Sequence, residues 1–175
     1  MNLKNLLMSV HAALKANQID HALIGAFAMA NYGVQRATGD IDFLIDEKDK
    51  QKTLNSLKNL GFTVSYESDE VLQFEGPGGV DFLLAKRELS RKMLEEAMNI
   101  KPLNIKCISI EGLIGLKIQA YKNNPKRELR DKADILSLIE QHPNLNWDQV
   151  KQYAELFDAW NEIVEIRKKI ENDQT

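Results

Sequence analysis

A short apolar run that begins with two acidic residues constrains this chain more than any other feature. Residues 40–45 read Asp-Ile-Asp-Phe-Leu-Ile. Because a β-strand sends alternate side chains to opposite faces, Asp40 and Asp42 would point one way and Ile41 the other. Neighbouring carboxylates repel each other and lose hydration, which a divalent cation such as Mg²⁺ offsets. Short acidic patterns are common, so a solvated start of a strand is the other interpretation.

Strand and helix patterns alternate in the first part of the chain, and helices dominate the rest. The expected strands are residues 21–25, 40–45, 62–66, 71–74, 80–84 and 105–108. The expected helices before residue 111 are 3–14, 26–32, 48–60 and 87–98. This order predicts an α+β fold, in which helices flank a mixed β-sheet and a helical C-terminal portion follows. A break at 142–144 suggests a main domain over residues 1–142 and a helical appendage over residues 143–175.

Composition narrows the class of protein. The net charge of −3 over 175 residues excludes a globally basic nucleic-acid binder, although a local basic surface is still possible. Cys107 is the single cysteine, so the sequence has neither a disulfide framework nor a thiol metal cluster. No apolar run approaches the roughly 20 residues that span a bilayer. We therefore expect a cytoplasmic protein without a membrane partner.

Gly25 and Ala26 stand where an expected strand turns into an expected helix. Glycine lets the backbone approach a ligand closely, and the free N–H groups at a helix start favour an anion such as phosphate. A plain tight turn would explain the same two residues without any function. The pair becomes informative only together with the aspartates.

Asp81 is a third acidic residue in an apolar strand, between Val80 and Phe82. A charged side chain in such a strand is rarely fully buried without a partner. If this strand pairs beside the one that carries Asp42, three carboxylates converge. Such a set commonly holds the metals of two-metal phosphoryl or nucleotidyl transfer.

Basic residues in the helical portion offer further candidates. Lys117 falls in the middle of an apolar helical stripe, so it either extends to the edge of the core or aims its ammonium at a carboxylate and phosphate cluster. Residues 122–132 are locally basic, which fits either a solvated helix face or a groove for triphosphate or RNA. Asp131 and Asp134 could hold these arginines in place or add to the acidic centre.

These motifs together resemble a known superfamily. Leu23-Ile24-Gly25-Ala26, followed after thirteen residues by Asp40-Ile41-Asp42-Phe43, resembles the hG[G/S]…DhDh signature of the nucleotidyltransferase fold. Residues 36–42 resemble the RxTxDhD version found in AbiEii-type toxin nucleotidyltransferases and in antibiotic-modifying bacterial proteins. Residues 80–83 match the strand of the third carboxylate, and residues 113–117 with 130–135 resemble the helical part. The resemblance covers roughly residues 20–140.

The resemblance implies a nucleotidyltransferase that moves an NMP from an NTP to an acceptor hydroxyl. Asp40, Asp42 and Asp81 would hold two Mg²⁺ ions, with Mn²⁺ as a possible substitute, and Asp81 would help to deprotonate the acceptor. That acceptor would be a tRNA end, a protein side chain or a small molecule. The toxin-like pattern tilts the expectation toward a macromolecule, with an antitoxin or regulatory protein as a possible partner.

The resemblance also implies nucleotide-binding residues. Gly25 and Ala26 would cradle the β- and γ-phosphates through backbone N–H groups, and Lys117 would neutralise charge on that tail. Arg36 and Thr38 would order their loop or touch the nucleotide. Ala26 departs from the glycine or serine usual at its position, so a serine hydroxyl is missing there. Two alternatives therefore stay open: a non-catalytic nucleotide- or RNA-binding module, and a carboxylate-metal nuclease.

Overall fold

The computed structural model describes residues 2–173, and these form two compact units. The first unit contains residues up to 28 and residues 36–108, and the second contains residues 29–35 and those from 109 onward. The domain boundary predicted after residue 142 falls inside the second unit. Each unit is described below by itself.

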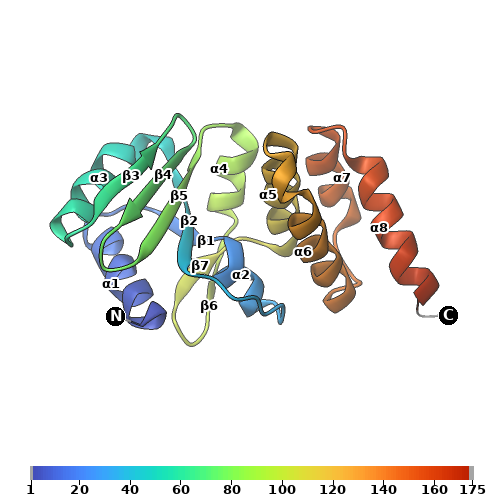
Figure 1. Ribbon diagram of the computed structural model, residues 1–175, viewed down its shortest axis with the longest axis horizontal. Helices are drawn as coiled ribbons and strands as arrows, with labels where there is room; N and C mark the ends of the chain where they lie inside the picture. Colours follow the sequence, from blue (N-terminus) through green and yellow to red (C-terminus); the bar gives the residue numbers. More distant parts are fainter. Residues whose placement is uncertain (1, 174–175) are drawn as a thin grey trace. The chain divides into compact units, whose positions relative to one another are not determined.

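The first unit is built on a seven-stranded sheet with the order β3-β4-β5-β2-β1-β7-β6 (Figure 1). Its strands are β1 (His21–Leu23), β2 (Asp40–Asp46), β3 (Thr63–Glu67), β4 (Val71–Glu75), β5 (Gly79–Ala85), β6 (Met98–Ile100) and β7 (Ile105–Cys107). The pairs β2–β5 and β1–β7 are parallel, and the other pairs are antiparallel. The predicted α+β fold with a mixed sheet flanked by helices is confirmed.

The helices follow the predicted order. They are α1 (Leu3–Ala16), α2 (Gly25–Asn31), α3 (Lys50–Asn59), α4 (Glu88–Glu95), α5 (Ile110–Asn123), α6 (Glu128–Gln141), α7 (Trp147–Glu155) and α8 (Trp160–Asp173), with 3-10 turns η1 (Glu47–Asp49) and η2 (Pro125–Arg127). Among the residues that the structure describes, no helix is long and apolar enough to cross a membrane.

One strand was not predicted. The sequence predicts a helix over residues 87–98, but α4 ends at Glu95 and β6 begins at Met98. Strand β6 exists because it pairs with β7, with Met98 opposite Cys107. The Met98 side chain is 76% exposed, so this edge strand lacks the apolar alternation by which a strand is predicted.

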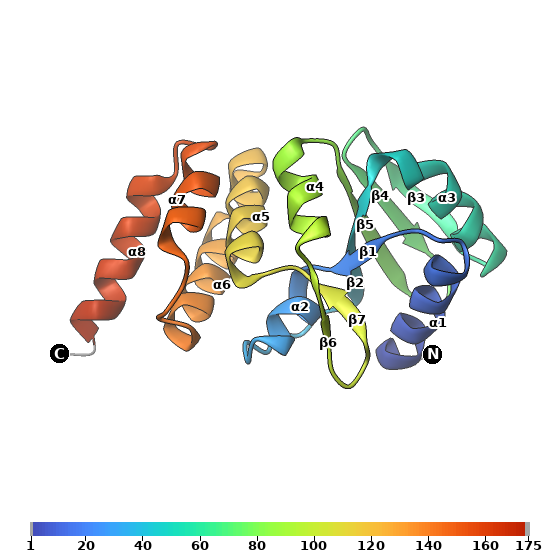
Figure 2. The ribbon, with the colours of Figure 1, turned by 180° about the vertical axis from the view of Figure 1, so that it is seen from behind.

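Aromatic side chains form the core on one face of the sheet. The rings of Phe43 and Phe82 stack at a centroid distance of 5.6 Å, and Phe74 meets Phe82 edge-on at 5.7 Å. His21 of β1 meets Phe43 edge-on and bonds His11 of α1, so α1 lies on this aromatic face. Helices α1 and α3 contact each other beside the sheet in both views (Figure 1 and Figure 2). The residues that alternate with these aromatic side chains along β2, β4 and β5 therefore point to the opposite face of the sheet.

Close packing of α5 against α7 explains why the second unit continues past residue 142. A methyl group built on Gly115 of α5 would lie 2.9 Å from Cγ of Tyr153, which is buried on α7. The chain break at His142 and Pro143 is therefore a connection between helices that share one core. On the residue 29–35 segment of the same unit, the Tyr32 carbonyl accepts a hydrogen bond from Nε2 of His142 at 2.7 Å.

A carboxylate hub joins α8 to α5 and α6. Glu162 accepts hydrogen bonds from the Tyr121 hydroxyl at 3.1 Å and from Lys122, and it pairs with Lys132 at 2.7 Å. Burial works to raise the pKa of Glu162, but the bonds from Lys122, Lys132 and Tyr121 outweigh it and lower that pKa to about 2. The ionised carboxylate thus contributes to the stability of this unit.

The contact between α5 and α7 predicts the effect of Gly115→Ala. Alanine favours a helix interior by about 1 kcal/mol over glycine. Here the new methyl would meet the base of the Tyr153 side chain, which cannot rotate away, so we expect a net loss of about 1–3 kcal/mol in the free energy of unfolding. Gly39→Ala is the control, because nothing lies within 4 Å of its added methyl. Urea unfolding of both variants measures the difference, and a stabilised Gly115→Ala protein would contradict the packing.

The Glu162 hub predicts a pH dependence. Because the folded pKa of about 2 lies below the unfolded value of 4.5, the contribution of Glu162 is fully present above pH 4.5 and is lost as the pH falls toward 2. Glu162→Gln should lower the free energy of unfolding by about 1 kcal/mol at pH 7, and the difference from the wild type should shrink at pH 3. Urea titrations at both pH values test this, and a pH-independent difference would contradict it.

Candidate active site

The sheet places the three predicted aspartates on one face of two neighbouring strands. Strands β2 and β5 run parallel in register, with Asp42 opposite Asp81 and Asp40 opposite Gly79. Their side chains alternate with Phe43 and Phe82, so they point away from the aromatic core. We call this surface, formed by Asp40, Asp42, Asp81 and Gln73 of β4, the aspartate face. Asp40 is exposed, and Asp42 and Asp81 are half-buried.

Two glycines make room for these carboxylates. A methyl group built on Gly25 would lie 2.1 Å from Oδ2 of Asp42, and one built on Gly79 would lie 1.9 Å from Oδ1 of Asp40. Gly25 also has a φ of +62°, which L side chains rarely adopt. The Ile24 N–H donates to the Asp42 carbonyl at 3.0 Å and fixes the turn against β2. The turn predicted at Gly25 and Ala26 thus lies directly beside the Asp42 carboxylate.

Asp81 is held by one neutral hydrogen bond. The Gln73 amide donates through Nε2 to Oδ2 of Asp81 at 2.7 Å. Burial raises the pKa of the Asp81 carboxyl, the bond from Gln73 lowers it, and the charge of Asp40 raises it again, so that the net shift is upward. The charge of Asp40 therefore acts on Asp81 across the aspartate face.

The donor chemistry of this face fits a hard divalent cation. Mg²⁺ commonly takes one or two protein carboxylates and completes its shell with water and substrate phosphates. In the chain from residue 2 to 173, however, no group of three or more His, Cys, Asp or Glu side chains is already placed to hold a metal. Asp40, Asp42 and Asp81 share a face without forming a preformed three-ligand group, and metal binding by them stays a prediction.

The loop before β2 is ordered by Thr38. Its hydroxyl accepts a hydrogen bond from the Asp40 N–H at 3.3 Å and lies 3.1 Å from the Asp40 carbonyl, to which it can donate. Arg36, at the start of the same loop, is half-buried. The Ala26 side chain is 2% exposed, so a hydroxyl at this position would also be buried. Nucleotide binding by this loop and by the turn before α2 stays a prediction, for Arg36, Thr38, Gly25 and Ala26 alike.

Lys117 lies in the helical unit, and its ammonium is bound there by two carboxylates. Nζ pairs with Oδ1 of Asp131 at 3.2 Å and also with Asp134, and all three side chains are buried. Arg127 adds a bond to Oδ2 of Asp131 at 3.0 Å. Asp131 and Asp134 therefore hold basic side chains of their own unit, which answers part of the question that the sequence left open. The predicted contact of Lys117 with a triphosphate stays a prediction.

The basic segment 122–132 is largely neutralised within its own unit. Lys122 and Lys132 bond Glu162, and Lys132 also bonds Glu128. Lys126 and Arg130 are exposed. Of the two interpretations offered by the sequence, the solvated helix face agrees better with these contacts.

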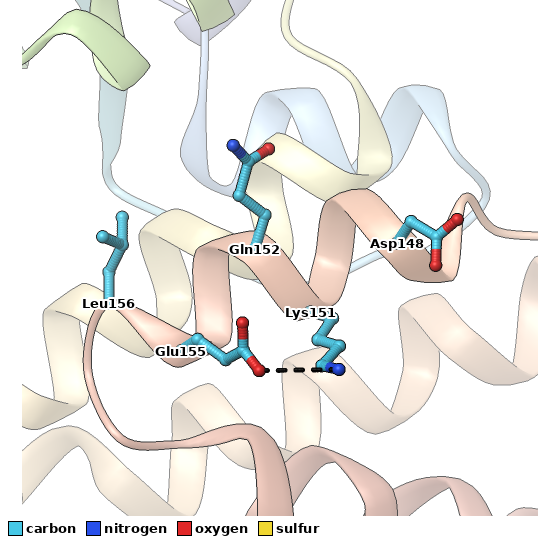
Figure 3. Close-up of a pocket in the computed structure, with 5 residues that line it drawn as sticks. All are labelled: Asp148, Lys151, Gln152, Glu155 and Leu156. Atoms are coloured by element: carbon cyan, nitrogen blue, oxygen red, sulfur yellow. Dashed lines mark ion pairs between the residues drawn. The ribbon is translucent and has the colours of Figure 1, made fainter.

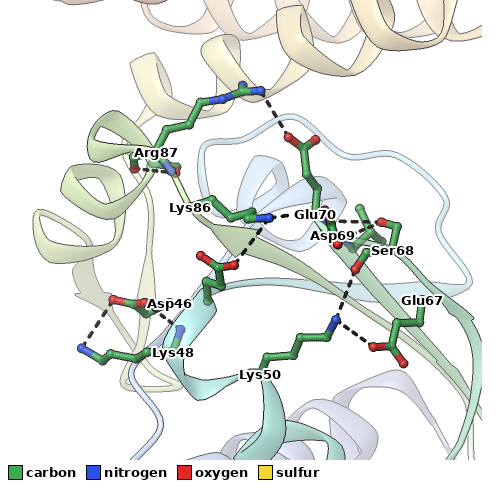
Figure 4. Close-up of polar contacts among 12 residues, drawn as sticks. Asp46, Lys48, Lys50, Glu67, Ser68, Asp69, Glu70, Lys86 and Arg87 are labelled. Atoms are coloured by element: carbon green, nitrogen blue, oxygen red, sulfur yellow. Dashed lines mark hydrogen bonds and ion pairs between the residues drawn. The ribbon is translucent and has the colours of Figure 1, made fainter.

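Two other surfaces carry charged side chains, but these side chains do not converge on a common point. At the end of β2 and β5 remote from Asp40, ion pairs join Lys50 to Glu67, Lys86 to Asp69 and Arg87 to Glu70 (Figure 4). A shallow hollow in the helical unit follows a single face of α7 (Figure 3). Its lining residues are Asp148, Lys151, Gln152, Glu155 and Leu156. Side chains from one helix face or in exposed ion pairs have no convergent geometry for chemistry.

A second hollow, between α1, β1 and the β6–β7 hairpin, contains a histidine pair. Nδ1 of His21 must donate to the Ile19 carbonyl at 2.7 Å, because that carbonyl can only accept. Burial lowers the pKa of both His11 and His21, so both are neutral at pH 7. Nε2 of His21 then accepts from Nδ1 of His11 at 2.8 Å. The pair links α1 to β1 and is satisfied without a ligand.

The comparisons with known proteins concern the fold. No protein-family model and no curated protein matches the chain. Among solved structures, the antibiotic-resistance factor ANT(2'')-Ia matches with a TM-score of 0.67 at 17% identity, over 97% of this chain and 99% of that one. The lincosamide antibiotic adenylyltransferase LnuA, lincomycin-bound, matches with a TM-score of 0.56 at 16% identity, over 79% and 96%. An antigenic nucleotidyltransferase-like protein from Paracoccidioides brasiliensis matches with a TM-score of 0.54 at 20% identity, over 95% and 92%.

At these identities the likeness shows the fold. The chain has the nucleotidyltransferase fold, and the resemblance that the sequence motifs predicted is confirmed at that level. The matches extend over most of each chain, so the likeness includes the helical unit as well as the sheet.

Sequence reasoning missed Gln73 as a member of the site. The sequence does contain an indication of this role: Gln73 is a polar residue between the apolar Leu72 and Phe74, just as Asp81 lies between Val80 and Phe82. What the sequence lacked was the register, which places Gln73 directly opposite Asp81.

The contact between Gly25 and Asp42 predicts the outcome of Gly25→Ala. The variant combines an unfavourable φ with a collision, so we expect it to lose about 2–4 kcal/mol in the free energy of unfolding. Gly33→Ala is the matched control, because Gly33 has a φ of +83° but its added methyl would meet only Gln141 Oε1 at 3.8 Å. It should lose about 1 kcal/mol. Urea unfolding measures both, and equal losses would show that the Asp42 carboxylate does not lie against Gly25.

Proposed function

We propose that this protein is a metal-dependent nucleotidyltransferase that transfers an NMP from an NTP to an acceptor hydroxyl. The observation that carries the proposal is the placement of Asp42 opposite Asp81, with Asp40 on the same face, in a chain with the nucleotidyltransferase fold. Crowded carboxylates on a half-buried face favour a bound cation. Such clusters typically mark functional sites.

In the proposed reaction the acceptor oxygen forms a bond to the α-phosphorus of the NTP. The bond between that phosphorus and the bridging oxygen to the β-phosphate breaks, and pyrophosphate leaves. Asp81 accepts the proton of the acceptor hydroxyl. Asp40 and Asp42, with Asp81, would hold Mg²⁺ or Mn²⁺, and two such ions would neutralise charge on the phosphates. The protein supplies mainly orientation and charge neutralisation.

Gly25 and Ala26 are the proposed phosphate contacts. They begin α2, and the first N–H groups of a helix have no acceptor within it, so they can donate to phosphate oxygens. This role uses the backbone, so Ala26 can fill it without a side-chain hydroxyl. Lys117 would contact the triphosphate only in exchange for its bonds to Asp131 or Asp134.

The acceptor is proposed to be a small molecule that bears a hydroxyl. This choice follows from the likeness over nearly the whole chain to an antibiotic-resistance factor and to a lincosamide adenylyltransferase. The RxTxDhD pattern at Arg36 favours a second candidate, a toxin-like enzyme that modifies tRNA or protein and is restrained by a partner protein. Ala26, where the superfamily usually has glycine or serine, favours a third candidate, a nucleotide- or RNA-binding module without activity.

Transfer of label from [α-³²P]NTPs tests these proposals. The protein is incubated with Mg²⁺, each labelled NTP and separate pools of total RNA, total protein and small hydroxyl compounds that include lincomycin. Asp42→Asn should lower transfer by at least about 100-fold, because it removes a metal-binding charge. Asp46→Asn is the matched control, since Asp46 ends the same strand and caps η1, a role that asparagine also fills.

The labelled pool identifies the acceptor class. Saturable NTP binding without transfer to any pool would support the non-catalytic module. Equal transfer by Asp42→Asn and the wild type would contradict the proposed site, and shortening of RNA without label transfer would indicate a nuclease.

A further inference from the structure

The third proposed carboxylate has a neighbour that no sequence motif includes. Gln73 lies on β4, opposite Asp81 on β5, which in turn lies opposite Asp42 on β2. The three residues form one row across three adjacent strands, and their side chains share the aspartate face. The row is set by the backbone pairing, so the Gln73 side chain starts at a fixed place next to Asp81.

The contact between Gln73 and Asp81 is directional. A carboxylate accepts hydrogen bonds, so the amide of Gln73 presents Nε2 to it and the donor lies 2.7 Å from Oδ2. Oδ2 is thereby held on the β4 side. This bond restrains the orientation of the carboxyl group, and Oδ1, which takes no part in it, can bind a proton or a metal ion.

The neutrality of Gln73 matters for what Asp81 can do. A lysine or arginine at this position would also orient the carboxylate, but it would form an ion pair that competes with a metal ion or a proton. Within the described part of the chain, no ion pair to Asp81 is found, and Gln73 is its hydrogen-bond partner. An amide fixes the geometry and leaves the negative charge available.

The strand itself does not require a glutamine at position 73. Gln73 stands between the buried Leu72 and Phe74 and is itself half-buried, where a threonine or valine would suit the strand at least as well. Its amide is satisfied through the carboxylate that is proposed to take the acceptor proton. Support of this kind, by a second residue behind a reacting or ligating group, is typical of sites that need a fixed geometry.

We infer that Gln73 is a positioning residue that orients the Asp81 carboxylate for the acceptor hydroxyl and its metal. This inference rests on the proposed nucleotidyltransferase function and adds to it a residue outside the superfamily signature. Gln73 acts through Asp81 and need not touch the substrate.

The test compares Gln73→Leu with the matched control Glu75→Gln. Leucine keeps the side-chain size and removes the donor, whereas Glu75 is on the same strand and face but is exposed and makes no side-chain bond to Asp81. With the acceptor pool found above, kcat of Gln73→Leu should fall about 10- to 100-fold while KM for the NTP stays within about twofold. Glu75→Gln should keep kcat within about twofold of the wild type.

Two further measurements separate positioning from folding. Gln73→His restores an N–H donor and should recover part of the lost kcat. The affinity for Mn²⁺, measured by calorimetry with a non-hydrolysable ATP analogue, should weaken by about 10-fold or more in Gln73→Leu and stay unchanged in Glu75→Gln. Thermal melting checks that each variant is folded.

The outcomes distinguish this inference from the proposed function. A wild-type protein that transfers no nucleotide would overturn both. An active wild type whose Gln73→Leu variant keeps normal kcat and Mn²⁺ affinity would overturn the role of Gln73 alone. A loss in Gln73→Leu that Gln73→His does not relieve, with a lowered melting temperature, would assign Gln73 to folding and also overturn it.

Discussion

The mutual repulsion of carboxylates is the constraint around which the first unit is built. Parallel pairing places Asp42 opposite Asp81, and Asp40 lies close enough to raise the pKa of Asp81 through its charge. This arrangement persists because the opposite face of the same strands buries a stacked pair of phenylalanines, Phe43 and Phe82. A slip of one residue would turn those rings to the other face, so the core enforces the register that crowds the charges.

The surroundings of the aspartates show how such crowding is accommodated. Gly25 and Gly79 leave the space that the carboxylates of Asp42 and Asp40 occupy, and Gln73 gives Asp81 a neutral donor. The second unit treats its buried charges differently. There Lys117 lies between Asp131 and Asp134, so that the charges are matched by direct pairing. In the second unit these buried charges are matched by direct ion pairs, whereas Asp81 in the first unit is bonded by a neutral amide.

Local patterns predicted the parts of the fold that depend on local physics. The alternation around Asp40 and Asp42, and around Asp81, was sufficient to predict their strands and the face to which they point. Contacts between distant parts of the chain could not be predicted, because they depend on which elements become neighbours. Three examples are the bond from Gln73 to Asp81, the ion pairs of Lys117 and the pairing of the strand at Met98. The helix break at His142 suggested a domain boundary. The contact between Gly115 and Tyr153, which joins the helices on either side of the break, cannot be predicted from the local sequence.

The fit between Gly25 and Asp42 limits which substitutions this chain can accept at position 25. A side chain at position 25 and a carboxylate at position 42 would compete for the same volume. Loss of the acidic group at position 42 would remove this collision, but the φ of +62° at Gly25 would still disfavour a side chain at the turn. Two independent constraints, the volume filled by the Asp42 carboxylate and the backbone conformation of the turn, therefore both require glycine at position 25.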